Sequence, residues 1–187
     1  MARIDALMSD MTLAEKIGQL VMVTAGTPVT GPVAGGDPTS GVRDGRIGSL
    51  LNLWGADATA AMQRVAVEES RLGIPLFFGF DVVHGHRTVF PIPLGEAAAF
   101  DPDLWEATAR TAAEEAAADG IDLTFAPMID VARDPRWGRI AEGPGEDPLV
   151  ACRMAAAKVR GFQGASLADP RSVAATPNAF AASGAYY

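Results

Sequence analysis

The chain has 187 residues, 49% of them hydrophobic, which suits a compact domain with a sizeable core. Its 15 basic and 23 acidic side chains give a net charge of −8, and no cluster of lysines and arginines forms a phosphate-binding stripe, so we expect no nucleic-acid partner. No apolar run approaches the roughly 20 residues that a bilayer-spanning helix needs, so we expect no membrane partner either.

The first residues and the cysteine content bear on the cellular compartment. The opening residues, MARIDALMSD, contain no apolar signal segment, so we expect a cytoplasmic protein. The single cysteine, Cys152, excludes an internal disulfide. Because Cys152 lies beside Val150 and Met154 in an expected helix, we interpret it as a small core residue and not as a nucleophile.

The predicted elements begin with a helix over residues 11–23, where Thr12 and Glu15 match a capping box. The helical spacing puts four apolar residues on one face: Leu13, Ile17, Leu20 and Val21. Residues 24–41 are dominated by Gly, Pro, Thr and Ser, and we predict a long loop there.

From residue 47 onward, short apolar strands alternate with helices. The predicted strands are 47–53, 75–80, 123–129 and 172–176. The predicted helices are 57–73 with Asp57 as N-cap, 103–120 after Asp101 and Pro102, and 149–164 after Asp147 and Pro148.

Strands that are apolar throughout are buried on both faces, and helices between them imply right-handed parallel crossovers. The sequence therefore predicts an α/β protein with about four parallel strands. Two architectures remain open: an open doubly wound sheet and part of a (β/α)8 barrel. No Gly-x-Gly-x-x-Gly follows the first strand, which weighs against a dinucleotide-binding sheet.

Polar residues collect after the second and third predicted strands, where parallel α/β folds bind ligands. Asp81 stands at the tip of the second strand, and the segment after the third contains Trp137, Arg139 and Glu142. A carboxylate, a guanidinium and an aromatic face together suit a neutral polyol. The alternative is purely structural: Arg136, Arg139, Glu142, Glu146 and Asp147 would pair with one another and cap the next helix.

Two histidines, His84 and His86, follow Asp81. Two candidate ligands at this spacing are a weak metal signal, because zinc sites need at least three well-placed groups. We therefore expect no metal, and expect both histidines to hydrogen-bond to the loop backbone.

Several segments together resemble glycoside hydrolase family 3, the β-glucosidase and β-xylosidase group, and are most similar to its bacterial β-glucosidases. These segments are MTLAEKIGQL, GSLLN, PLFFGFDVVHGHRTVFPIPLGEAAAFDPDLWE, FAPMIDVARDPRWGRIAEGPGEDP and VRGFQG. The resemblance implies that residues 1–187 form a single domain, the N-terminal half of a (β/α)8 barrel. It also implies hydrolysis of terminal β-D-glucosyl residues with retention, a small β-glucoside as the partner, and no cofactor.

The resemblance also implies roles for individual residues. Asp81 and Arg139 match the family's sugar ligands in the first subsite, and we count Trp137 and Glu142 as further candidate substrate-binding residues. The sequence departs from the family pattern at Asn178 and Ala179, where the family typically has lysine and histidine.

The family's nucleophile and acid/base match no position in this chain, so we assign no catalytic residue and expect the chain alone to be inactive. A novel carboxylate pair, Asp81 with Asp130 or Glu142, stays open, although nothing in the spacing selects it.

A half barrel leaves two unpaired sheet edges. We therefore expect a homodimer formed through these edges. The alternative function is a non-catalytic half-barrel scaffold or a weak sugar-binding module that self-associates. Related full-length enzymes are often periplasmic or secreted, as the resemblance implies.

Overall fold

The computed structural model describes residues 2–25, 37–179 and 183 of the chain. It divides into two compact units, Met1–Phe80 and Asp81–Tyr187, which we describe in turn. The expectation of a single domain over residues 1–187 stays a prediction. Most of the loop expected over residues 24–41 lies outside the described residues.

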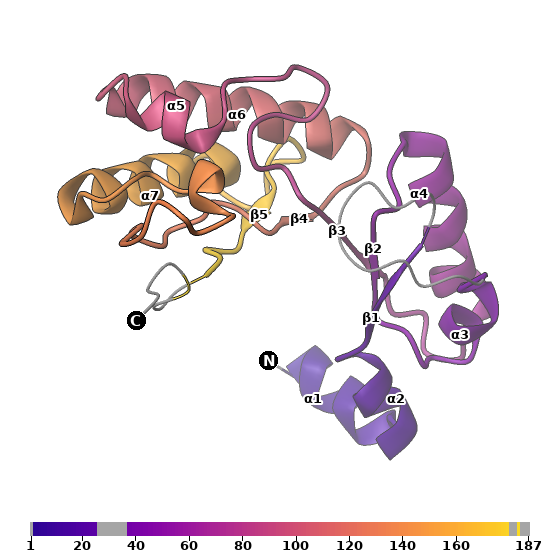
Figure 1. Ribbon diagram of the computed structural model, residues 1–187. Coiled ribbons are helices and arrows are strands. Elements are labelled where there is room, and N and C mark those ends of the chain that lie inside the picture. The colour runs from indigo at the N-terminus through magenta and orange to yellow at the C-terminus, as the bar shows by residue number, and fades with distance from the viewer. Residues whose placement is uncertain (1, 26–36, 180–182, 184–187) are drawn as a thin grey trace. The chain divides into compact units, whose positions relative to one another are not determined.

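The first unit contains a parallel sheet in the order β1-β2-β3 (Figure 1). Its strands are β1 (Met22–Thr24), β2 (Ser49–Leu51) and β3 (Phe77–Phe80). Its helices are α1 (Ala2–Asp10), α2 (Leu13–Gly18), α3 (Thr39–Arg43), α4 (Ala56–Arg64) and the π-helical turn η1 (Val65–Glu69). Leu50 and Phe78 are paired in register across β2 and β3, and both are buried, as expected for strands that are apolar throughout.

The expected helix over residues 11–23 is wrong in its second half. The capping box is present, with Thr12 Oγ1 accepting from Glu15 N and Glu15 Oε2 from Thr12 N, but the helix ends at Gly18. A Cβ at Gly18 would overlap the carbonyl oxygen of Gly45, so two backbone segments meet closely there. The residues that follow then pair with β2 as strand β1.

The apolar face expected on that first helix is largely open to solvent in the described structure. Leu13 is 74% exposed and Leu20 88% exposed, and Ile17 is also exposed. Asp57 is not an N-cap, because α4 begins earlier: Gly55, with a φ of 99°, holds the N-cap position.

The second unit contains β4 (Leu123–Thr124) and β5 (Ala174–Ala175), which pair in parallel. Its helices are α5 (Pro93–Ala97), α6 (Pro102–Ala118), the 3-10 turn η2 (Ile140–Glu142) and α7 (Pro148–Gln163). The described residues thus contain five strands, and the expectation of a parallel α/β fold is confirmed, although about four strands were expected. The strand missed by the sequence is β1.

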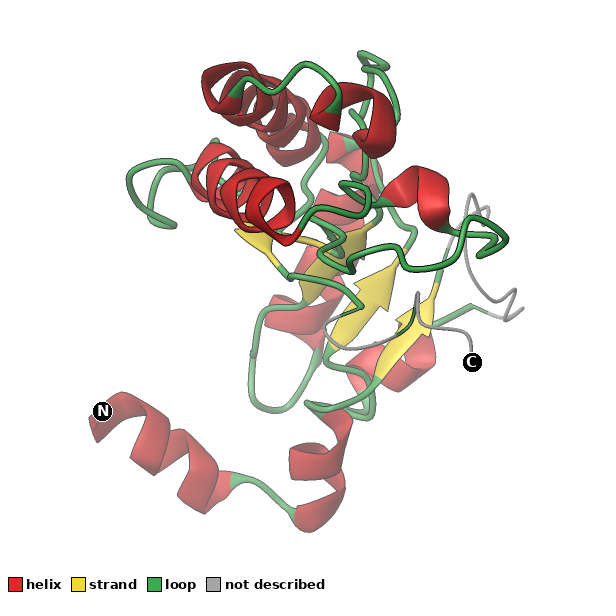
Figure 2. Ribbon diagram, turned by 60° about the vertical axis from the view of Figure 1, so that its left-hand side comes forward, coloured by secondary structure: helices red, strands yellow, loops and turns green. Residues whose placement is uncertain are grey.

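The long helices α6 and α7 begin where the sequence predicts. Asp101 Oδ1 accepts hydrogen bonds from the backbone N–H groups of the first turn of α6, and Asp147 Oδ1 does the same for α7. The two helices lie side by side (Figure 2). A Cβ at Gly161 would overlap the backbone of Glu106, so this glycine permits the close approach of α7 to α6.

Between these helices lies the core of the second unit. Trp105 packs with Met154, Ala157 and Ala97, and its indole N–H donates to the carbonyl oxygen of Glu96 at 2.6 Å. The core also encloses an ion pair between Lys158 and Glu96, with Lys158 Nζ donating to Thr108 Oγ1 at 2.9 Å. Burial lowers the pKa of Lys158, and Glu96 opposes that shift.

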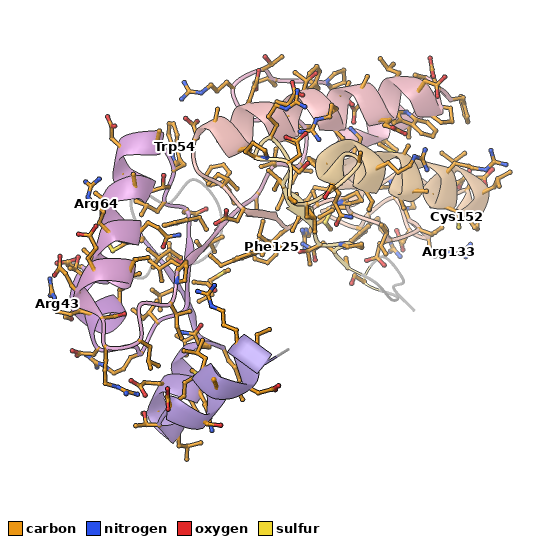
Figure 3. All side chains as sticks on the ribbon, turned by 180° about the vertical axis from the view of Figure 1, so that it is seen from behind. Arg43, Trp54, Arg64, Phe125, Arg133 and Cys152 are labelled. Atoms are coloured by element: carbon orange, nitrogen blue, oxygen red, sulfur yellow. The ribbon has the colours of Figure 1, made fainter. Side chains whose placement is uncertain are left out.

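The expectation that Cys152 is a core residue is wrong, because its thiol is exposed on α7 (Figure 3). The buried residues of α7 include Ala151, Met154 and Ala157, which recur at helical spacing. Cys152 follows Ala151 directly and is turned about 100° away from that face. No helix in residues 2–25 and 37–179 is long and apolar enough to cross a membrane.

Candidate functional site

Asp81 is the first residue after β3, and its neighbour anchors the chain to β4. The backbone N–H of Val82 donates to Thr124 Oγ1 at 3.1 Å, and both residues are fully buried. The sequence expectation that Asp81 stands at the tip of a strand is therefore confirmed. A carboxylate at this position can accept hydrogen bonds from two adjacent hydroxyl groups.

Beyond Asp81 the loop closes on itself as a short hairpin. His84 Nδ1 lies 3.0 Å from the carbonyl oxygen of Phe90, and Phe90 N donates to His84 O at 2.9 Å. Gly85 and Val89 form an antiparallel bridge. The expected hydrogen bond from His84 to the loop backbone is thus confirmed.

For His86 the expectation of a backbone partner misses its main contact. Its Nε2 atom lies 2.7 Å from Asp119 Oδ2, on the turn that ends α6. The sequence contains no signal for this pair, because the two residues are 33 positions apart. Among the described residues, no group of three or more His, Cys, Asp or Glu side chains is arranged to hold a metal ion.

Arg139 and Glu142 form the central ion pair of the segment after β4. Arg139 Nε lies 3.0 Å from Glu142 Oε1, Arg139 Nη2 lies 2.6 Å from Glu142 Oε2, and both side chains are partly exposed. The hydrogen bonds that Arg139 donates to Glu142 raise the pKa of Arg139 against the effect of burial, and the charges of Glu142, Asp81 and Asp130 add to the rise.

Met128 contacts this ion pair and pairs with Asn178, beyond the ends of β4 and β5. Its Sδ atom lies 3.7 Å from Arg139 Nη2, and its backbone forms an isolated parallel bridge with Asn178. Met128 and Asp130 are both buried. The Oδ2 atom of Asp130 has no hydrogen-bond partner in the part of the chain that the structure describes.

The positions that depart from the family pattern, Asn178 and Ala179, lie at this isolated bridge. Asn178 N donates to Pro127 O at 2.9 Å, and Asn178 Nδ2 donates to Phe125 O at 3.3 Å. Ala179 follows with a φ of 57°, in the left-handed region, and its N–H donates to Asn178 Oδ1. The amide of Asn178 is therefore used to bind backbone groups.

The structural alternative also holds for part of the segment. Arg136 pairs with Asp134, with Nη2 2.5 Å from Oδ2, and its side chain is 85% exposed. Asp147 caps α7, as described above. Trp137, a candidate for the aromatic face, is buried, and its role in sugar binding stays a prediction.

Two residues that sequence reasoning missed are Glu115 and Asp119. Both lie at the end of α6 and contact the hairpin after Asp81. Glu115 lies in the last turn of the alanine-rich helix α6, and Asp119 is its C-cap. The apolar pattern of this helix indicates which of its residues are buried but not which loop its polar residues contact.

Comparison with known proteins gives a consistent assignment. A family model described as the glycosyl hydrolase family 3 N terminal domain matches residues 12–186. The chain is 44% identical over 183 residues to a "Periplasmic beta-glucosidase" of Salmonella typhimurium, covering 96% of this chain and 23% of the relative. It is 35% identical to a "Lysosomal beta glucosidase" of Dictyostelium discoideum, covering 86% of this chain and 22% of the relative.

A solved structure agrees. The crystal structure of a β-glucosidase from Listeria innocua in complex with isofagomine matches with a TM-score of 0.88 and 39% identity, over 98% of this chain and 26% of that chain. This chain therefore spans about a quarter of the length of such relatives. The chain belongs to glycosyl hydrolase family 3, as part of its N-terminal domain.

Proposed function

We propose that this chain supplies one wall of the glucose-binding site of a β-glucosidase. In this proposal Asp81 accepts hydrogen bonds from two neighbouring sugar hydroxyls, and Arg139 donates to a third oxygen. The observation that carries the proposal is the placement of Asp81 directly after β3, while Arg139 follows β4 in the same unit of the chain.

The chemistry of these groups favours a neutral ligand. The positive charge of Arg139 is already matched by Glu142 in a bidentate pair, with Asp81 and Asp130 nearby. An anionic ligand would meet several carboxylates, whereas a polyol both donates to carboxylates and accepts from a guanidinium. The names of the relatives, β-glucosidases and β-xylosidases, support a sugar of this kind.

We further propose that the chain alone does not hydrolyse glucosides. Retaining hydrolysis needs two carboxyl groups about 5 to 5.5 Å apart, one as nucleophile and one as proton donor. Both carboxylate oxygens of Glu142 accept hydrogen bonds from Arg139, so Glu142 is not placed to donate a proton to a leaving group. The catalytic pair would come from the rest of a full-length enzyme.

Two measurements on the purified chain test this proposal. Calorimetry with glucose should show weak binding that Asp81→Ala and Arg139→Ala each abolish, while Arg136→Ala, at an exposed neighbouring arginine, leaves it unchanged. An assay with a chromogenic aryl β-glucoside should show no turnover. Turnover that depends on Asp81 would overturn the claim of an inactive chain, and absence of glucose binding would overturn the claim of a sugar site.

A second proposal is that the chain self-associates as a homodimer through its open sheet edges. In the described residues, β1 pairs with β2 and β5 pairs with β4. The exposed apolar side chains of α2 add surface whose burial in a dimer would be favourable. Light scattering should show twice the mass of one chain, and a strictly monomeric chain that unfolds cooperatively would contradict this proposal.

We also propose a cytoplasmic location. The observation in favour is the exposed, unpaired thiol of Cys152, which suits a reducing compartment. The relative from Salmonella, named as periplasmic, points the other way. Fractionation of the native cells decides between them.

A further inference from the structure

The hairpin after Asp81, residues 81–92, is attached to the end of α6 by two acidic side chains, Glu115 and Asp119. Each binds a different part of the hairpin tip. Both contacts join residues about thirty positions apart, so they hold the hairpin by tertiary structure and not by its own sequence.

Asp119 binds the first part of the tip through charged groups. His86 Nε2 lies 2.7 Å from Asp119 Oδ2, and Arg87 Nη2 donates to Asp119 Oδ1. The side chains of His86 and Asp119 are each only 4% exposed. Burial would raise the pKa of Asp119, but the hydrogen bonds from Arg87 and His86 hold it below its usual value. The buried Asp119 carboxylate therefore depends on His86 and Arg87 for its hydrogen bonds, and these bonds fix both residues at the end of α6.

Glu115 binds the second part of the tip through backbone groups. Its Oε2 atom accepts from the backbone N–H groups of Arg87 and Thr88, each at 2.8 Å, and its Oε1 atom accepts from Thr88 Oγ1 at 2.6 Å. The side-chain and backbone hydrogen bonds from Thr88 lower the pKa of Glu115. One side chain thus provides the acceptors for two successive backbone donors of the tip.

Contacts within the hairpin connect its tip to Asp81 at its base. Its two arms are joined by the His84–Phe90 hydrogen bonds, and Gly85 has a φ of 113°. A Cβ at Gly85 would overlap the carbonyl oxygen of Thr88, so the arms are packed as tightly as a backbone allows. At its other end, Val82 is bound to Thr124. Asp81 therefore leaves β3 at the base of a loop that is fixed both at its base and at its tip.

We infer that Glu115 and Asp119 are positioning residues for the sugar site: they fix the hairpin that begins at Asp81, and so the direction of the Asp81 carboxylate. This inference rests on the proposed function, because it concerns how the proposed sugar ligand Asp81 is held. Neither acid needs to touch the sugar. The neighbouring residue Glu114, on the same helix, provides a control, since its ion pairs are with Arg110 and Arg171, which lie outside the hairpin.

The test compares Glu115→Ala with Glu114→Ala in the full chain, with Glu115→Gln as the conservative variant. Alanine preserves the helix, so α6 should keep its slow amide exchange in both alanine variants. In Glu115→Ala, the amides of Arg87 and Thr88 should exchange about tenfold faster, and glucose should bind about three to ten times more weakly. Glu114→Ala should change neither. Glu115→Gln keeps one acceptor oxygen and should restore part of both quantities.

Asp119→Asn provides the second arm. It removes the charge but keeps the shape, so the His86 ring resonances in an NMR spectrum should shift and glucose affinity should fall. Unchanged exchange at Arg87 and Thr88 in Glu115→Ala, or faster exchange with unchanged glucose affinity, would overturn the inference.

The outcome is separable from that of the proposed function. If the unmodified chain does not bind glucose, the proposed function fails, and the inference is judged by the carboxyl carbon resonance of Asp81. A shift of that resonance in Glu115→Ala but not in Glu114→Ala supports the positioning role. No shift in either variant removes it.

Discussion

The two loops that carry Asp81 and Arg139 are held in different ways. Both follow a strand, and both present a candidate sugar ligand. The hairpin 81–92 is attached to α6 by contacts that span about thirty residues, with buried partners such as His86 and Asp119. In the segment 130–147 the side-chain ion pairs join residues only two or three positions apart, and both arginines are more than half exposed. Its backbone is closed by a hydrogen bond from Ala132 N to Gly145 O at 2.9 Å.

The two loops therefore differ in whether water can replace a lost side-chain partner. Exposed ion pairs such as Arg136–Asp134 contribute little to stability, because water and salt screen them and the side chains lose freedom. A buried carboxylate that loses its partners has no water to replace them. We therefore expect the hairpin to be rigid and sensitive to mutation, and the segment around Arg139 to tolerate change.

The largest expected effect distinguishes two glycines, one in each loop. Gly85→Ala introduces a Cβ that overlaps the backbone of Thr88 at a positive φ, and should lower the free energy of unfolding by up to about 3 kcal/mol. Gly138→Ala is the control, because a Cβ there meets nothing within 4 Å. Urea denaturation measures both. Equal midpoints for the two variants would contradict the contrast between the loops.

The next effect concerns the charge at the end of α6. Asp119→Asn weakens the hydrogen bonds to His86 and Arg87 and should cost about 2 kcal/mol of unfolding free energy, as is typical for hydrogen bonds to a charged group. The midpoint of urea denaturation should fall with an unchanged m-value. A stability equal to that of the unmodified chain would show that the buried pair contributes nothing.

A smaller effect appears in the dependence of stability on pH. The pKa values of Glu115 and Asp119 are lowered in the folded chain, so their contribution is present above their unfolded values, about 4.3 and 3.9, and is lost as the pH falls through the folded values. The stability gap between the unmodified chain and Asp119→Asn should therefore narrow below about pH 4. Urea denaturation at pH 7, 5, 4 and 3 measures the gap. A gap that widens in acid would reverse the sign assigned here.

The smallest effect is expected at the exposed pair of the other loop. Arg136→Ala removes the partner of Asp134, but the arginine is 85% exposed, so the denaturation midpoint should stay within experimental error. The amide of Arg136, which donates to Asp134 Oδ1, should keep its exchange rate. A clear loss of stability would show that local pairs order this loop more strongly than their exposure suggests.

Much of the fold could be predicted from the sequence because its signals are local. Asp101 and Asp147 cap α6 and α7 as expected, since an N-cap acts on backbone groups two or three residues away. Asp81 was placed at a strand end by the apolar run before it. Strand β1 was missed, because its residues continue the apolar pattern of α2 and only pairing with β2 makes them a strand.

The sequence by itself determined the family, the alternation of strands and helices, the helix caps and the candidate ligands Asp81 and Arg139. Only the tertiary structure decided that Cys152 is exposed, that Asp130 and Trp137 are buried, and that Glu115 and Asp119 hold the hairpin. The physical reason is the separation along the sequence between the residues that interact. Caps, turns and pairs of neighbouring charges act within about four residues and leave a readable pattern, whereas a contact across thirty residues exists only once the chain has closed on itself.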